Sequence, residues 1–303
     1  MGCATVTLRT SGTMGLVTKA RQVLGIQVAD DLLARWAGWF APDPQPFLVP
    51  RCSELAQLGG PLTGGAGGPE WRDTFWIYTL AEDTACRAIS FAEFMALPSG
   101  TRSALVRAQR GLGRELVPSV RAWPGLRYLG TGEQADGHRF VWWPSLLEGR
   151  EREVLVPFVE EGRRRSRHGE VSAGVWQEAS RVLPGARELA GTFPLGSGLN
   201  CFGTVMGAAG VPGAAEQWMQ REPFEEWLAA ETRPGGRDEQ PGTVLVWRSS
   251  SGLVQHAAVT VGDGWALHKP SQGWMSPTKV LTVGELLLSA RARDRRLTRR
   301  SLR

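Results

Sequence analysis

The sequence predicts an α+β protein in which a cysteine-bearing helix packs on an antiparallel sheet and a mixed α/β domain precedes this module. Two observations lead to this prediction. An apolar run of helical character begins at Cys201. Between Pro241 and His268, three short β-rich runs follow one another across tight turns. The length of 303 residues allows a sizeable core that needs neither a disulfide nor a metal to hold it.

The composition is that of a globular protein, with 42% hydrophobic and 21% charged residues. No apolar run approaches the roughly 18 residues that span a bilayer. The N-terminus shows no basic region followed by an apolar core, which a secretory signal requires. We therefore expect a cytoplasmic protein with no membrane span, and export by a signal-independent route stays open. The oligomeric state is also open.

The formal net charge of +5 comes from two basic segments, at 163–167 and at 291–303. No aromatic residue is interleaved in the second segment to stack on bases, so it predicts a solvated tail and no nucleic-acid partner.

The four cysteines are far apart and form no Cys-x-x-Cys pair. We therefore expect no disulfide framework, no metal site and no cofactor.

The first elements are predicted from periodicity and turn residues. Apolar residues recur at helical spacing over 28–40, and prolines close that segment. The Gly-rich stretch 59–69 is either a linker or a mobile loop. The run 71–80 is typical of a strand, and Ser90 to Glu93 has the capping-box pattern of a helix start.

Further elements follow up to the motif. After the turn at 98–101, a second helix is predicted through about Leu116. The runs 127–129 and 139–143 are predicted to pair as strands, and 154–159 is a third β-rich run. A helix over 171–183 leads to the motif. We divide the chain into an N-terminal domain of unknown family (1–165), the domain with the motif (166–290) and a basic tail (291–303).

The residues around Cys201 are those of a nucleophile at a helix start. Asn200 is predicted to cap the helix, so that the thiol in the first turn lies at the positive end of the helix dipole, which favours the thiolate. Gly203 keeps this turn thin enough for a substrate backbone to approach, and free N–H groups there can stabilise an oxyanion. Taken alone, the cysteine fits a buried structural role as well.

Two histidines on the β-rich runs favour the catalytic interpretation. The runs 241–248, 254–261 and 265–268 form an antiparallel meander, in which a Gly-Asp-Gly turn joins the last two. His256 and His268 are then cross-strand neighbours. His256 is predicted to take the proton of Cys201, and His268 to fix the tautomer of His256.

Together these motifs resemble the NlpC-type branch of the papain-like cysteine peptidases. That branch carries Asp-Cys-Ser-Gly at the helix start, Pro-Gly-Asp-Leu at a strand start, and a His strand with a Gly-Asp-Gly turn and a third polar residue. The counterparts in this chain are Asn200 to Gly203, Pro241 to Val244, and His256 to His268. The resemblance covers about residues 189–290. It implies a papain-like module with Cys201, His256 and His268 as the catalytic residues.

The resemblance also indicates a changed substrate. In the cell-wall endopeptidases of this family, an Asp and a Ser beside the nucleophile help to bind a free substrate amine, and here Asn200 and Phe202 replace them. We expect Asn200, Phe202 and Gly203 to contact a different substrate, which contains a peptide or another amide. An ordinary free-amine peptidoglycan stem is not expected.

The sequence thus predicts a cysteine hydrolase that cleaves an amide (peptide or isopeptide) bond through an acyl-enzyme thioester, with residues 1–165 as a cap or specificity domain. Two alternatives stay open. If the cap excludes water, the same residues transfer the acyl group to an amine or alcohol. The other alternative is a non-catalytic member that binds a peptide in its cleft.

Overall fold

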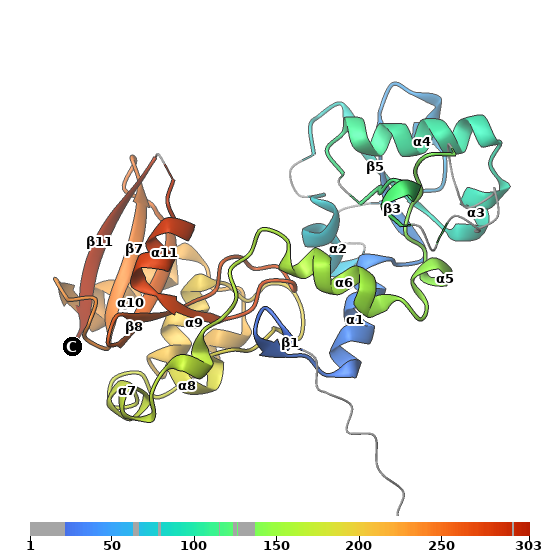
Figure 1. Ribbon diagram of the computed structural model, residues 1–303. Helices are drawn as coiled ribbons and strands as arrows, with labels where there is room; N and C mark the ends of the chain where they lie inside the picture. The colour runs from blue at the N-terminus through green and yellow to red at the C-terminus, as the bar shows by residue number, and fades with distance from the viewer. Residues whose placement is uncertain are drawn as a thin grey trace, which may run out of the picture.

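The computed structural model describes residues 22–62, 67–77, 80–114, 116–123, 126, 137–292 and 294–303. The chain forms two lobes, one built on a large antiparallel sheet and one on helices with a small sheet (Figure 1). Helices and antiparallel sheets are combined in both lobes, which confirms the α+β class. None of the helices in the described part of the chain is long and apolar enough to cross a membrane.

The C-terminal lobe contains a six-stranded sheet in the order β10-β9-β8-β7-β11-β6. The predicted meander is confirmed, because β7, β8 and β9 are consecutive antiparallel neighbours. The strands are β6 (Thr232–Pro234), β7 (Thr243–Ser249), β8 (Val254–Gly262), β9 (Trp265–His268), β10 (Lys279–Thr282) and β11 (Arg295–Leu302).

Helices cover both faces of this sheet. The helices of the lobe are α7 (Ala173–Ala179), α8 (Ala186–Leu189), α9 (Cys201–Ala208), α10 (Arg221–Glu231) and α11 (Val283–Ser289), with short 3-10 turns η4 (His168–Glu170) and η5 (Ala214–Glu216). Alternation along the strands assigns each side chain to one helix layer. Ala257 and Val259 of β8 pack on the α9 side, whereas Ala258 packs with Leu286 on the α11 side.

The basic segment 291–303 is not the solvated tail that its charge predicted. Residues Arg295–Leu302 form β11, which pairs with β7 on one side and β6 on the other. Arg295 and Arg296 are exposed, Arg299 is paired with Asp238, and Arg300 donates to Thr232. Leu297 and Leu302 pack against the cores. Charge alone misled the prediction, since solvent and polar partners accommodate these arginines within a strand.

The N-terminal lobe surrounds a three-stranded sheet in the order β3-β5-β4. Its strands are β3 (Gln45–Pro50), β4 (Gly60–Pro61) and β5 (Thr84–Ile89), and a separate hairpin joins β1 (Gln22–Val23) to β2 (Ile26–Gln27). The helices are α1 (Asp30–Phe40), α2 (Gly68–Phe75), α3 (Phe91–Ala96), α4 (Ser99–Gly111), α5 (Pro144–Leu147) and α6 (Glu151–Glu160), with 3-10 turns η1 (Glu54–Gln57) and η2 (Val120–Ala122).

Local signals identified two of these helices correctly. Helix α1 buries its predicted apolar face, including Trp36 and Phe40. The capping box of α3 is present, because Ser90 Oγ accepts from the N–H of Glu93 and the Glu93 carboxylate accepts from the N–H of Ser90. Helix α4 is present too, but it ends at Gly111 rather than near Leu116. Helix α7 is likewise shorter than the predicted 171–183.

Several predicted strands are wrong. The run 71–80 lies partly in helix α2, and 154–159 lies in helix α6, where Val154, Leu155 and Val159 pack into the core. Tertiary burial thus outweighs the β propensity of these valines. Residues 139–143 form no strand beyond a single bridge from Arg139 to Ser119. Their predicted partner, 127–129, lies outside the described residues, as do residues 63–66 of the Gly-rich stretch.

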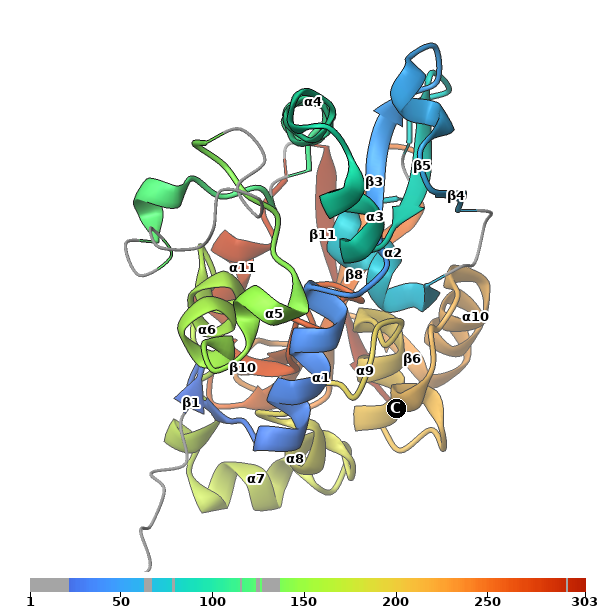
Figure 2. The ribbon, with the colours of Figure 1, turned by 90° about the vertical axis from the view of Figure 1, so that its right-hand side faces the viewer.

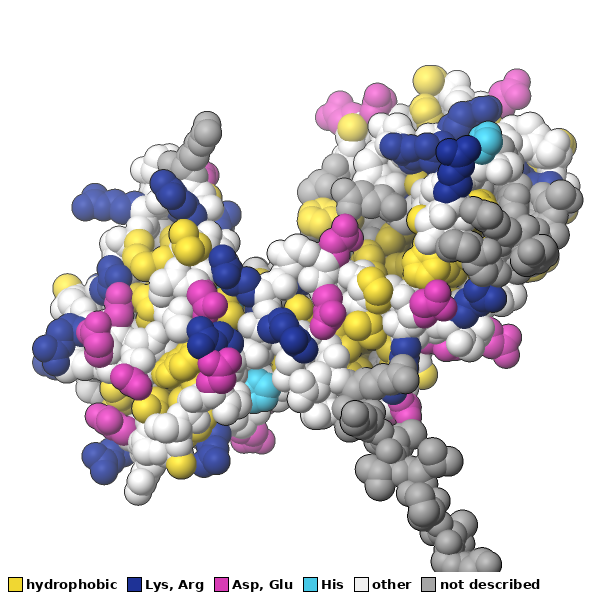
Figure 3. Space-filling view, viewed as in Figure 1, with side chains coloured by type: hydrophobic (Ala, Val, Ile, Leu, Met, Phe, Trp, Pro, Cys, Tyr) yellow, Lys and Arg dark blue, Asp and Glu magenta, His cyan; other side chains and the backbone are white. Residues whose placement is uncertain are grey.

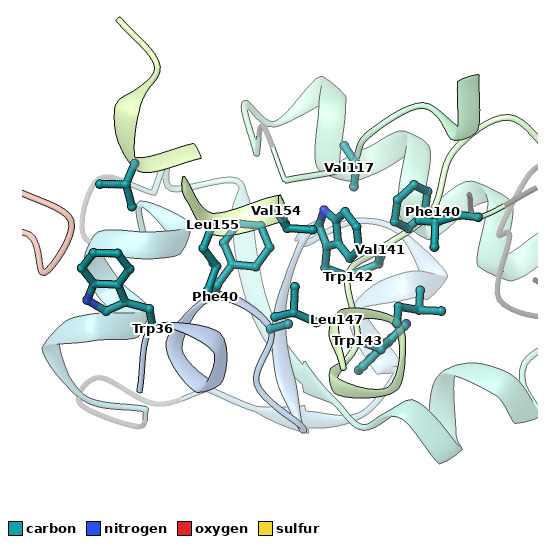
Figure 4. Packing of buried hydrophobic residues seen from close by; sticks show 14 of the residues in the cluster. Trp36, Phe40, Val117, Phe140, Val141, Trp142, Trp143, Leu147, Val154 and Leu155 are labelled. Atoms are coloured by element: carbon teal, nitrogen blue, oxygen red, sulfur yellow. The ribbon is translucent and has the colours of Figure 1, made fainter. Parts of the chain in front are cut away.

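Trp36, Trp142 and Trp143 are buried in the core of the N-terminal lobe. Figure 4 shows Trp36, Phe40 and Trp142 among aliphatic side chains of α1, α6 and the segment before α5. Trp274 of the C-terminal part is fully buried in the same core, with its ring centroid 5.6 Å from that of Trp36. The two lobes are therefore joined by a shared aromatic contact. On the face in Figure 3, basic and acidic side chains are interspersed over both lobes.

Candidate functional site

Cys201 begins helix α9, as the sequence predicted. Asn200 caps the helix, since its Oδ1 accepts from the N–H of Gly203 at 3.0 Å. The thiol meets the backbone N–H groups of Cys201 itself, of Phe202 and of Ala257 on strand β8. Donors from the helix start and from the sheet thus converge on the sulfur, which is the arrangement that stabilises negative charge at this point.

The thiol is nevertheless protonated in this state. Burial raises the pKa of Cys201 to about 11, although the backbone N–H groups and the Lys269 ammonium act to lower it. Desolvation disfavours the charged form more than the helix start favours it. The expectation of a thiolate from the helix position alone is therefore wrong for the structure described.

The two predicted histidines lie next to each other. Their ring centroids are 5.9 Å apart with nearly perpendicular planes. They do not form the predicted hydrogen bond, because both ring nitrogens of His268 are buried without a partner among the described residues. Burial lowers the pKa of His256 to about 4 and that of His268 well below its ordinary value, so both rings are neutral. In this structure His268 therefore makes no hydrogen bond that could fix the tautomer of His256.

The sheet separates these rings from the thiol. His256 is the register partner of Trp247, and their ring centroids are 5.2 Å apart. Trp247 belongs to the core on the α11 side, whereas Cys201 packs with the core on the α9 side. The structure therefore brings His256 to His268 but leaves both rings across the sheet from Cys201. The register between β7 and β8 shifts next to His256, and such a bulge re-aims side chains.

Lys269 is the charged residue that the sequence analysis missed. It is 1% exposed, and its ammonium donates to the carbonyl of Ser276. It interacts electrostatically with Cys201 and Asp73, and burial lowers its pKa to about 7. Strand alternation offered a signal, since the residue directly after His268 projects toward the opposite, α9, side of the sheet.

Helix α2 of the N-terminal lobe lies against the loops beside this site (Figure 2). Four successive contacts attach it to the other lobe. The N–H of Ser197 donates to Glu70 at 3.0 Å, and Gln272 Nε2 donates to Asp73 at 3.3 Å. Trp274 Nε1 donates to Thr74 at 2.8 Å, and the Arg72 guanidinium lies 4.6 Å from the Trp218 ring centroid. The N-terminal lobe therefore contributes side chains directly to the surroundings of Cys201.

The three residues predicted to contact substrate have structural roles instead. Both polar atoms of Asn200 are engaged, since its Nδ2 donates to Met219 O at 2.7 Å in addition to the cap. Phe202 is 8% exposed and stacks on Phe224 with centroids 4.6 Å apart. A Cβ on Gly203 would lie 2.3 Å from the carbonyl oxygen of Ala214. Glycine is required here by close packing of the chain rather than by the approach of a substrate.

Two surface cavities lie away from Cys201, in the N-terminal lobe. These cavities, of about 630 and 580 Å³, are lined by N-terminal residues that include Leu33, Phe40 and Trp142, and neither is lined by Cys201. Among the described residues, no group of three His, Cys, Asp or Glu side chains is placed to hold a metal ion.

No protein-family model matches the chain, and no curated protein or solved structure shows significant similarity to it.

Proposed function

We propose that the protein is a cysteine hydrolase, a divergent member of the NlpC-type papain-like superfamily, that cleaves an amide through an acyl-enzyme thioester on Cys201. One observation carries the proposal: the thiol lies at the start of a capped helix, where three backbone N–H groups meet the sulfur. Such donors are suited to the oxyanion of a tetrahedral intermediate. The resemblance in residues 189–290 supports the same chemistry.

In the proposed reaction, the Cys201 sulfur attacks the amide carbonyl and its proton passes to a neutral base. The base returns the proton to the departing amine, and water then hydrolyses the thioester. Because the thiol and both imidazoles are neutral in the folded protein, the base must be neutral when it accepts the proton from the sulfur. His256 can serve only after its ring leaves Trp247 and reaches the α9 side of the sheet.

A second candidate is a non-catalytic member that binds a peptide. The observation in its favour is the separation of the thiol from both imidazoles by the sheet, together with the raised pKa of Cys201. Acyl transfer to an amine, with the same nucleophile, is the third outcome that an experiment has to distinguish.

The test is turnover of a panel of N-acylated and free-amine peptide amides by the purified full chain. Cys201→Ala is expected to abolish cleavage, and Cys52→Ala, which removes an exposed thiol, is expected to retain it. Free-amine substrates should react at least about tenfold more slowly, because neither Asn200 nor Phe202 offers a free acceptor to an ammonium.

Each alternative has its own result in this panel. Product joined to an added amine, with little free acid, indicates acyl transfer. Binding without cleavage, equal in wild type and Cys201→Ala, indicates the non-catalytic member. Faster cleavage of free-amine stem peptides than of N-acylated amides would contradict the proposed substrate preference.

A further inference from the structure

The buried ammonium of Lys269 lies on the same side of the sheet as the thiol. We propose that Lys269 is the proton acceptor for Cys201, and that Asp73 of the N-terminal lobe is a positioning residue that supports its charged form. This inference rests on the proposed function, in which Cys201 is the nucleophile. Under this proposal, residues of both lobes contribute to the site.

The burial of Lys269 calls for an explanation, because an ammonium is costly to bury unless it is paired or deprotonated. Lys269 is 1% exposed and takes part in none of the salt bridges of the described residues. Among the described residues its ammonium donates a hydrogen bond to the carbonyl of Ser276. Burial lowers the pKa of such a lysine toward neutrality, so that the neutral amine needed by a general base is populated.

The geometry selects Lys269 over His256 as the base. Leu267 of β9 packs on the α9 side, and the next residue, His268, has its ring near that of His256. Continued alternation directs Lys269 back toward the α9 side, and its electrostatic interaction with Cys201 agrees with this placement. His256, by contrast, contacts Trp247 on the far side.

Asp73 supplies a carboxyl group from helix α2. Burial raises the pKa of this carboxyl group, and its hydrogen bonds with Ser197 and Gln272 act to lower it. Asp73 is 6% exposed; its Oδ1 accepts from Gln272, and its Oδ2 is buried without a hydrogen-bond partner among the described residues. Its carboxylate raises the pKa of Lys269, as does Cys201. The other charged groups near Asp73 are Arg72 and Glu70 on its own helix, and His268 is the further titratable group that interacts with Lys269.

The proposed step is a single proton transfer. The proton of Cys201 Sγ moves to the neutral Lys269 Nζ, which leaves a thiolate and an ammonium, and no other reactant is needed. With a pKa of about 7, Lys269 becomes neutral near neutrality and can then accept the proton. The pKa of about 11 for Cys201 keeps the proton on the sulfur in most molecules, so the thiolate is a minor species that a substrate or an alkylating reagent consumes.

The test is the pH dependence of the alkylation of Cys201 by iodoacetamide, followed by peptide mapping of the full chain. In wild type the rate should rise with a midpoint near 7, well below the direct ionisation of the thiol. Lys269→Met should remove this rise and leave alkylation to follow the direct ionisation of the thiol at higher pH. Asp73→Asn should move the midpoint to lower pH, because the ammonium loses a stabilising anion.

Matched variants separate the roles. Glu70→Gln removes a charge from the same helix and can still accept from the N–H of Ser197, so the midpoint should stay near that of wild type. His256→Ala should also keep the rise. A rise that persists in Lys269→Met, or that disappears in His256→Ala, overturns the inference, and so does an unshifted midpoint in Asp73→Asn. Failure of the proposed function is seen separately, as absence of Cys201-dependent turnover in the amide panel.

Discussion

At the scale of single residues, burial sets the protonation state of the site. The folded protein keeps His256 neutral with a pKa of about 4, whereas an unfolded histidine has a pKa of about 6.5. Between these two values the unfolded chain binds more protons than the folded one, so the free energy of unfolding decreases as the pH falls. The stabilisation that neutral His256 provides is fully present above about pH 6.5, the pKa of a histidine in the unfolded chain. It is lost as the pH falls to about 4, the pKa of His256 in the folded protein.

We predict that acidification from about pH 7 to about pH 4.5 costs about 2 to 3 kcal/mol through His256 alone. His256→Phe, which keeps an aromatic ring beside Trp247, should lose this part of the acid sensitivity. Urea unfolding of both proteins at the two pH values measures the difference. An equal decrease in stability in wild type and variant would show that His256 is not held neutral.

Local chemistry predicted part of the site and tertiary contacts decided the rest. Asn200 capping and the position of Cys201 follow from residues adjacent in sequence, so they were predictable. The pKa of the thiol and the buried side chain of Lys269 depend on helix α2 and the sheet packing around them, which are distant in sequence. His256 keeps the alternation of Ala258 and so lies on the α11 side, and a period of two in the sequence does not tell which face of the strand meets α9.

At the scale of elements, strand β11 shows how a charged segment becomes structural. It lies between β7 and β6 and pairs with β7 over seven register positions, from Arg295 to Ser301. Without it, the backbone groups along this edge of β7 would lose their partners and β6 would lose its place in the sheet. Periodicity did not predict this strand, because arginines occupy positions where an apolar alternation is usually sought.

We predict that truncation of residues 294–303 abolishes cooperative unfolding of the C-terminal lobe. Arg296→Gln, which keeps the strand and removes one exposed charge, should unfold within about 0.5 kcal/mol of wild type. Urea titration followed by circular dichroism measures both proteins. A truncated chain with the unfolding midpoint of wild type would contradict the structural role of β11.

Helices α2 and α6 are the elements whose type the sequence misidentified. Both contain β-branched or aromatic residues, which favoured a strand, but Phe75 of α2 and the apolar residues Val154, Leu155 and Val159 of α6 are buried within helices. For α2 the error concealed a contact between the lobes, since this helix carries Glu70, Asp73 and Thr74 to the loops that contain Ser197, Gln272 and Trp274. The meander of β7 to β9 was predictable because its turns and alternation are local.

At the scale of the whole molecule, the two lobes are in direct contact beside the candidate site. Trp274 is buried in the N-terminal core, and helix α2 contacts the loops that contain Ser197 and Gln272. The sequence predicted an N-terminal domain over the cleft, but it gave no sign that Asp73 would face a buried lysine. Such a contact between residues 196 positions apart has no local signature.

The central claim, that Cys201 is a nucleophile which forms an acyl thioester, has a direct measurement. The full chain is mixed with p-nitrophenyl acetate, quenched in acid, and mapped by mass spectrometry for acetyl groups on its cysteines. Acetyl is expected to accumulate on Cys201, to be released by hydroxylamine, and to be absent in Cys201→Ala, while the exposed Cys52 is little modified. Acetyl on Cys52 or on lysines with none on Cys201 would show that Cys201 is not the nucleophile.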